Sequence, residues 1–309
     1  MKKNILIVGG SGFVGINILK KINYKKYRVF ATYFRSKKFL KTPNVKYIKG
    51  DLKNYNFCKR ISKTIDTVIM CAAVSSGAMI IQNNPMYHVN DNIIMNMNIL
   101  KASAQNKVKK FIFLSSNTVY PVSKKSMAEK NLNYSLFSKY FNVGWMKIFS
   151  EKLCEMYKKN MKILIIRPAN LYGPYDKFDP VRSKVIPALI RKFESKKNIE
   201  VWGSGKDVKD FIFIEDFVDN LLLIIEKINK YNVLNIASSK PVSLRKIIDI
   251  LKKEYSYKKP KITFNKDKPT MIPFRKISNK KIKRIIKFKL NFTIQEGLKK
   301  TIKWYKKNK

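Results

Sequence analysis

The chain has 309 residues, enough for one large α/β unit or two lobes with substantial cores, and its 45% hydrophobic content is ordinary for a soluble globular protein. No apolar run approaches the roughly eighteen residues that a membrane span needs, so we expect no membrane segment. The formal net charge of +46 suggests an anionic partner, but the lysines are spread along the whole chain among residues that share A/T-rich codons. We therefore expect no dedicated nucleic-acid role, although the charge should steer anionic substrates toward the protein.

The first fifteen residues carry the strongest motif. An apolar run at 4–8 suits a buried parallel strand and leads directly into Gly9-Gly10-Ser11-Gly12-Phe13-Val14-Gly15, after which an amphipathic run begins. Glycines spaced three apart between a strand and a helix are typical of dinucleotide binding. Gly9 would make the tight turn, Gly12 would let the backbone approach a pyrophosphate, and Gly15 would let the helix pack on the strand. The phosphates would lie at the helix N-terminus.

The first half of the chain alternates between short apolar runs and longer amphipathic runs. This pattern predicts further strands at 28–33, 45–48, 67–73, 110–115 and 162–167, and helices at 90–107 and 140–158. Such alternation implies a parallel sheet with helices on both faces and right-handed crossovers. We predict an α/β fold: a Rossmann-type doubly wound parallel sheet with a smaller C-terminal α/β substrate domain.

The character of the chain changes after Pro168, where proline and glycine recur between short elements. A segment of this kind is a natural substrate lobe over the carboxyl ends of the strands. We place an NAD(P)-binding Rossmann domain at 1–168 and a substrate-binding domain at 169–309. Strands predicted at 211–216 and 233–236 let segments near 211–240 return to the first domain, so the two domains interleave. The apolar spacing within 280–309 predicts packed structure despite its many lysines.

The cysteines and the single histidine give little sign of metal or disulfide chemistry. Cys58, Cys71 and Cys154 are odd in number and widely spaced, which fits reduced thiols better than a disulfide frame or a metal site. We interpret His88 as a helix-start or packing residue. The N-terminal apolar run leads into the glycine loop, which favours a first strand over a signal peptide. We therefore expect a cytoplasmic protein.

Several short motifs follow one another along nearly the whole chain. They are GGSGFVG at 9–15, GDL at 50–52, AA at 72–73, LSSNTVYP at 114–121, KLCE at 152–155, NLYGP at 170–174, VIPAL at 185–189 and VWGSG at 201–205. In this order and spacing the chain resembles the extended short-chain dehydrogenase/reductase family of NAD-dependent epimerases and dehydratases, and within it the GDP-L-fucose-synthase-like branch. The resemblance implies NAD(P)-dependent epimerisation, reduction or oxidation of a nucleoside-diphosphate sugar, such as a GDP-linked 4-keto-6-deoxy hexose.

The resemblance also implies which residues hold the cofactor. Asp51 would bond the adenine and Lys147 the nicotinamide ribose, and the others are Gly9, Gly12, Phe13, Val14, Gly15, Leu52, Ala72, Ala73, Asn170 and Leu171. Relatives that prefer NAD place an acid near the end of the second strand, where it accepts from the ribose 2′-hydroxyl. Residues 33–38 contain no acid, and Arg35 can pair a 2′-phosphate through two N–H groups. We expect NADP, with NAD as the alternative.

The catalytic signature implied by the resemblance is incomplete. In this family a serine, a tyrosine and a lysine carry the chemistry, the last two as YxxxK on one helix, where a spacing of four places them on one face. The lysine lowers the pKa of the phenol, which can then exchange a proton with the substrate. Ser116 matches the serine and Lys147 the lysine, but the tyrosine position is Val143, which can neither donate nor accept a proton.

Further departures lie nearby. The cysteine expected two residues after the serine is Thr118, and the histidine expected before Val-Ile-Pro is Lys184. The arginines expected near the nucleotide are Lys192 and Lys209, which keep the charge but not the bidentate fork. Trp202 would border the nucleotide with Lys209.

Three hypotheses follow. The protein is an oxidoreductase with a rebuilt proton path, through Tyr140, Lys184, Tyr175 or a water held by Ser116 and Thr118. Alternatively it binds cofactor and sugar nucleotide without turnover, or it is a scaffold whose basic surface carries the function. Since relatives commonly dimerise through a four-helix bundle that includes the YxxxK helix, we also expect a homodimer.

Overall fold

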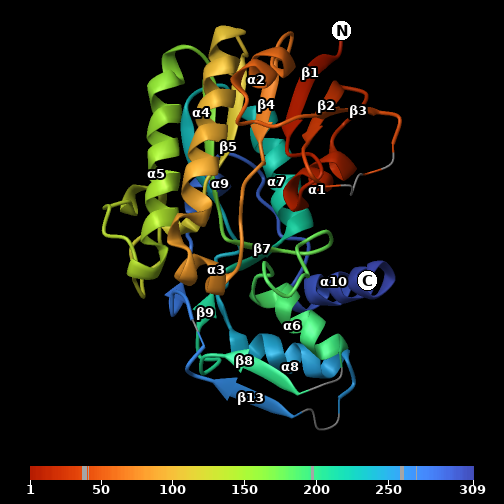
Figure 1. The fold of residues 1–309 in the computed structure, drawn as a ribbon, viewed down its shortest axis with the longest axis vertical. Helices are drawn as coiled ribbons and strands as arrows, with labels where there is room; N and C mark the ends of the chain where they lie inside the picture. The colour runs from red at the N-terminus through yellow and green to blue at the C-terminus, as the bar shows by residue number, and fades with distance from the viewer. Residues whose placement is uncertain (37–39, 41, 196–197, 258–260, 269) are drawn as a thin grey trace.

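A computed structural model describes residues 1–36, 40, 42–195, 198–257, 261–268 and 270–309 (Figure 1). Its centre is a seven-stranded sheet in the order β11-β6-β5-β4-β1-β2-β3, and each neighbouring pair of strands is parallel. The strands are β1 (Lys3–Val8), β2 (Tyr27–Tyr33), β3 (Val45–Lys49), β4 (Thr67–Met70), β5 (Lys110–Leu114), β6 (Lys162–Pro168) and β11 (Asn232–Ile236). This is the doubly wound Rossmann-type sheet that the sequence predicts.

Successive residues of each strand face opposite sides of this sheet, as the pleat requires. Ile5 and Ile7 of β1 join one buried cluster, whereas Leu6 and Val8 join the other. Helices α1 (Phe13–Lys21) and α7 (Ile214–Lys227) cover the first face, and α2 (Tyr55–Ile61), α4 (Val89–Gln105) and α5 (Phe141–Met156) cover the second (Figure 1). Because both faces are covered, the strands read as continuous apolar runs.

The remaining elements form a smaller lobe beyond the carboxyl ends of the strands (Figure 1). Its helices are α3 (Ala78–Asn83), α6 (Val185–Glu194), α8 (Leu244–Glu254) and α10 (Ile294–Asn308). The short helix α9 (Lys280–Lys283) instead packs against β11 of the main sheet. Its small sheets pair β7 (Asn170–Tyr172) with β10 (Phe211–Phe213), β8 (Ile199–Trp202) with β13 (Ile262–Asn265), and β9 (Val208–Lys209) with β12 (Val242–Ser243) and β14 (Phe274–Arg275). Short 3-10 turns lie at Pro85–His88, Asn117–Val119, Glu129–Asn131, Ser138–Tyr140 and Tyr157–Lys159.

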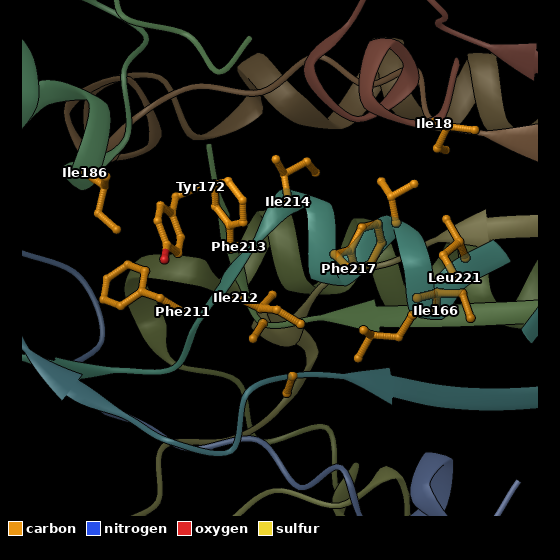
Figure 2. Packing of buried hydrophobic residues seen from close by; sticks show 14 of the residues in the cluster. Ile18, Ile166, Tyr172, Ile186, Phe211, Ile212, Phe213, Ile214, Phe217 and Leu221 are labelled. Carbon is orange, nitrogen blue, oxygen red and sulfur yellow. The ribbon is translucent and has the colours of Figure 1, made fainter. Parts of the chain in front are cut away.

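One hydrophobic cluster continues from the main sheet into this lobe. Figure 2 shows Ile166 of β6 close to Phe217 and Leu221 of α7, and the same cluster runs on to Tyr172 and Phe211 of the small β7–β10 sheet. The two parts of the chain therefore share a core, which fixes the lobe over the edge of the sheet.

Two predicted strands differ from the structure. The strand predicted at 211–216 ends at Phe213, and Ile214 begins α7. Glu215 and Asp216 occupy the first turn of that helix, where the helix dipole favours acids. The strand predicted at 67–73 ends at Met70, and the residues after it line the cavity described below.

Two predictions for the second half of the chain are confirmed. The strand predicted at 233–236 is β11, which returns to the main sheet beside β6. In the lysine-rich C-terminal segment the apolar positions are buried, among them Ile282, Ile286, Leu298 and Ile302. All three cysteines are free thiols. None of the helices in the described part of the chain is long and apolar enough to cross a membrane.

Candidate functional site

A cavity of about 690 Å³ lies between the sheet and the smaller lobe. The loop after β1 and the carboxyl ends of β2, β4 and β5 line it on one side, and α6 and the segment 200–209 line it on the other. Of the residues that the sequence places in the site, all except Gly15 and Tyr175 border this cavity: Gly9, Gly12, Phe13, Val14, Arg35, Asp51, Leu52, Ala72, Ala73, Ser116, Thr118, Tyr140, Lys147, Asn170, Leu171, Lys184, Lys192, Trp202 and Lys209.

The three glycines of the first motif have different surroundings. Gly9 has φ +85°, and a Cβ there would lie 2.7 Å from the backbone of Ala72. Gly15 packs beneath the loop, where a Cβ would lie 2.3 Å from the Gly9 carbonyl oxygen. A Cβ on Gly12 would meet only that oxygen, at 3.2 Å, and otherwise project into open space. Since no side chain caps α1 at Gly12, the loop is shaped to receive an anionic group against backbone N–H donors.

The end of β2 carries a cation and no acid. Arg35 is exposed beside the cavity, and its guanidinium carbon lies 5.1 Å from the centre of the Phe34 ring. Lys37 and Lys38, the last two residues of the predicted ribose-binding stretch, lie outside the described residues. Across the loop Asp51 accepts a hydrogen bond from the backbone N of Lys53 at 2.9 Å.

Helix α5 brings Lys147 to the serine loop after β5. The Lys147 ammonium donates to the Leu114 carbonyl oxygen at 2.9 Å, and burial lowers the pKa of Lys147 to about 8 against the opposing effect of Glu151. Thr118 donates to the Ser116 hydroxyl oxygen at 2.9 Å. Val143 lines the cavity one turn before Lys147, so an apolar side chain occupies the predicted phenol position.

A buried polar network, which the sequence did not reveal, supports this loop from below. Glu151 and Arg167 form an ion pair at 2.6 Å, and Glu151 also accepts from Ser115, the neighbour of Ser116. Arg167 donates to the Tyr120 hydroxyl at 3.0 Å, and Tyr120 donates to Asn235 of β11 at 2.7 Å. Every charge here is paired, as burial requires. The network holds the serine loop, α5 and two strands in one arrangement.

The structure separates the candidate proton donors. Tyr140 borders the cavity, and burial raises its pKa to about 12, with Arg275 and Asp207 among its charged neighbours. Lys184, exposed to the cavity, stands directly before α6. Tyr175 is absent from the described lining of the cavity, because its ring packs on Trp304 with the ring centres 4.8 Å apart. Tyr175 is therefore a poor candidate.

On the lobe side, the predicted substrate-binding side chains already have partners. Lys192 donates to the Glu200 carbonyl oxygen at 2.6 Å, and Trp202 donates to the Glu200 carboxylate at 3.1 Å. Lys209 lies 3.4 Å from the Asp207 carboxylate. A phosphate arriving here would have to compete with the Glu200 carbonyl oxygen for Lys192 and with the Asp207 carboxylate for Lys209.

Comparison with known proteins identifies the family. Residues 5–237 match the NAD-dependent epimerase/dehydratase family. The chain belongs to this family. Epimerase/dehydratase enzymes act as nucleotide-sugar oxidoreductases and epimerases that bind NAD(P), so the protein is an enzyme of that general class.

Individual members of the family match most of the chain. GDP-L-fucose synthase of Escherichia coli (strain K12) is 28% identical over 265 residues, covering 80% of this chain and 82% of that protein. A dTDP-4-dehydro-6-deoxy-D-allose reductase of a Streptomyces species is 23% identical over 320 residues, covering 99% of this chain and 97% of the relative. The UDP-glucose 4-epimerase of Thermotoga maritima, solved with UDP-glucose, superposes with a TM-score of 0.87 at 24% identity, covering 98% and 99% of the two chains. This last likeness supports the fold.

The residues of this epimerase/dehydratase chain fit the family's dinucleotide cofactor. The open space above Gly12 is where a pyrophosphate backbone would approach, and Lys147 has N–H groups beyond the one that Leu114 accepts. Bound there, the cofactor would supply or accept a hydride at the end of the cavity that Ser116 and Val143 line.

Proposed function

We propose that this enzyme uses NADPH to reduce the 4-keto group of a nucleoside-diphosphate 6-deoxy sugar. The observation that carries the proposal is that one cavity joins the glycine loop, Ser116 and Lys147, and the aromatic and basic side chains of the lobe. Relatives named as a GDP-L-fucose synthase, a GDP-L-colitose synthase and a dTDP-keto-sugar reductase support the substrate class.

The preference for NADPH rests on the end of β2. A 2′-phosphate carries charge that a carboxylate would repel, and residues 33–36 include Arg35 and no acid. The exposed Arg35 guanidinium borders the cavity and is free to swing onto that phosphate. NAD is the alternative cofactor.

Each side chain then has a role. Ser116 would donate to the keto oxygen, Lys147 would hold the nicotinamide ribose, and Asn170 and Leu171 would border the nicotinamide. Trp202 would stack on the base, with Lys192 and Lys209 near the phosphates. We assign cofactor binding to residues 1–168 and the returning segments, and sugar-nucleotide binding chiefly to 169–309.

Two substitutions favour reduction over epimerisation. Epimerisation beside a keto group needs a base to remove a carbon-bound proton and an acid to return it. Thr118 stands where the resemblance expects a cysteine, and its hydroxyl donates to Ser116, which leaves no strong base there. Lys184 replaces the expected histidine.

A second function, binding without turnover, is favoured by Val143. The decisive experiment follows loss of NADPH absorbance with GDP-4-keto-6-deoxymannose and its dTDP counterpart, comparing the native protein with Val143→Tyr. We expect the native protein to oxidise NADPH. If only Val143→Tyr does so, the native chain is a binding protein. If both are silent while NADPH still binds, the substrate class is wrong.

We also propose a homodimer formed through α4 and α5. These helices present large apolar side chains to solvent, including Ile94, Met97, Trp145, Phe149 and Met156. The spacing of four between Trp145 and Phe149 places them on one face of α5, and an apolar stripe of this kind is typical of an interface. Sedimentation equilibrium of the purified chain measures the oligomeric state directly.

A further inference from the structure

The loop between β7 and α6 brings an acid to the cavity that the sequence motifs did not single out. Asp176 is 8% exposed and borders the cavity. One carboxylate oxygen accepts from the backbone N of Lys177 at 2.8 Å. The other, Oδ2, is buried and has no hydrogen-bond partner in the described structure. A buried polar atom without a partner is costly, so this oxygen points to a ligand that the site is built to receive.

Contacts on two sides hold this loop in place. Lys177 donates to the carbonyl oxygen of Ser75 at 2.8 Å and to its hydroxyl at 3.2 Å. On the other side Asn17 of α1 donates to the carbonyl oxygen of Pro174 at 3.0 Å. The segments also touch at Gly77, where a Cβ would lie 2.6 Å from the Ser183 carbonyl oxygen. The Asp176 carboxyl is therefore held in position by the fold.

Burial and the charged groups around Asp176 act on its pKa in opposite directions. Burial raises the pKa of Asp176 to about 6, although the Lys184 and Lys177 ammonium groups act to lower it. On the facing segment His88 is neutral, because burial lowers its pKa to about 4 with help from the same two lysines, and it is bonded to Ser76 at 2.9 Å. The carboxylate of Asp179 forms an ion pair with the Arg182 guanidinium, with Nε and Oδ1 3.3 Å apart. Asp176 makes no ion pair with any described residue, so no salt bridge holds its carboxyl in the ionised form.

Lys184 connects this acid to the catalytic helix. Its ammonium lowers the pKa of Asp176, and it also lowers the pKa of Lys147. Lys184, Asp176, Lys147 and Val143 all line the same cavity. A sugar that fills this cavity would meet the Asp176 carboxyl as well as Ser116.

We propose that Asp176 is the catalytic acid that protonates the reduced keto oxygen, in place of the phenol that Val143 removes. This inference rests on the proposed reductase function. As the keto carbon gains a hydride, the electron pair of its C=O double bond moves to oxygen. The O–H bond of Asp176 breaks, the proton forms the new sugar hydroxyl, and the Asp176 carboxylate regains a proton from water. Tyr140 and Lys184 are the competing donors.

The kinetic test compares Asp176→Asn with Asp179→Asn, a matched change three residues away on the same loop. Asparagine keeps the size and polarity of Asp176 but has no acidic proton. We expect Asp176→Asn to lower kcat about 100-fold, in the range typical of general acids, while Asp179→Asn stays near the native value. Native kcat should fall as pH rises past about 6, because the acid must be protonated. Adding Val143→Tyr to Asp176→Asn should restore turnover, and kcat of the double variant should no longer fall as pH rises past about 6.

A second readout does not need turnover. In carboxyl-labelled protein, the ¹³C resonance lost in Asp176→Asn should titrate near pH 6 and shift when GDP-mannose, which has no keto group, is added. The inference is overturned if Asp176→Asn retains kcat within about 3-fold of native, or if GDP-mannose leaves that resonance unmoved. Failure of the proposed function is distinguishable, since the native protein and Val143→Tyr would then both leave NADPH unoxidised, and the resonance alone would decide whether Asp176 contacts the sugar.

Discussion

The two halves of the cavity recognise their ligands by different means. On the sheet side the glycine loop offers backbone N–H groups and open space, and a Cβ on Gly12 would meet only one backbone oxygen. On the lobe side Lys192 and Lys209 offer side-chain charges, and each is already held by Glu200 or Asp207. The first half is ready for a phosphate as it stands, whereas the second must exchange a protein carbonyl oxygen and a carboxylate for ligand phosphates.

This difference separates binding strength from selectivity. Backbone donors cost no side-chain entropy when a ligand arrives, so we expect them to dominate cofactor affinity. Side chains that must leave an existing partner contribute only the difference between two interactions. The lobe should therefore discriminate among sugar nucleotides more than it adds to their affinity.

The largest expected effect comes from closing the space above Gly12. Gly12→Val should weaken NADPH binding at least about 100-fold, or roughly 3 kcal/mol, because the new side chain fills the pyrophosphate position. The melting temperature should change little, since that space is otherwise empty. Calorimetric titration and thermal unfolding measure the two effects. Gly15→Ala is the matched control: its Cβ would lie 2.3 Å from the Gly9 oxygen, so stability should fall. Intact NADPH binding by Gly12→Val would refute the loop as the phosphate site.

A smaller effect is expected at the end of β2. Arg35→Ala should weaken the binding of NADPH about 10-fold, because one charged hydrogen-bonding pair is lost. The affinity for NADH should stay unchanged. Fluorescence titration with both cofactors measures the ratio. Arg28→Ala, which removes an exposed arginine within β2, controls for the loss of general positive charge. Equal weakening of the two cofactors would mean that Arg35 does not read the 2′-phosphate.

The smallest expected effect tests the lobe. Asp207→Asn should free Lys209 and tighten nucleoside-diphosphate binding by about 3-fold, because an arriving phosphate would no longer have to displace a carboxylate from the lysine. The gain should shrink at high salt. Asp267→Asn, an exposed acid outside the cavity lining, serves as control. If Asp207→Asn weakens binding instead, the carboxylate orients Lys209 rather than competing for it.

The cofactor half was predictable because its signals are local. A strand, three glycines and a helix lie within the first 22 residues, and the structure places them as the motif requires. The absence of an acid after β2 and the valine at 143 can likewise be recognised within one short segment of the sequence each.

The rest depends on pairs that are far apart in the sequence. Glu151 pairs with Arg167, and Asn235 accepts from Tyr120, 115 residues away. Whether Asp176 is solvated or buried depends on Ser75 and Asn17, which hold its loop from distant elements. No pattern near Asp176 carries that information. The strand predicted at 211–216 failed for a related reason: Phe211–Phe213 looks apolar throughout, but the acids after it start a helix.

The place of β11 beside β6 has a consequence for the way the chain is made. Strand β6 is synthesised well before residues 232–236, and until they arrive its outer edge of apolar residues 163–166 presents unpaired N–H and C=O groups. Such an edge is a template for pairing with another chain. A fragment that stops at residue 168 would carry the whole glycine loop and yet aggregate, and on the ribosome the same interval is when this protein most needs a chaperone.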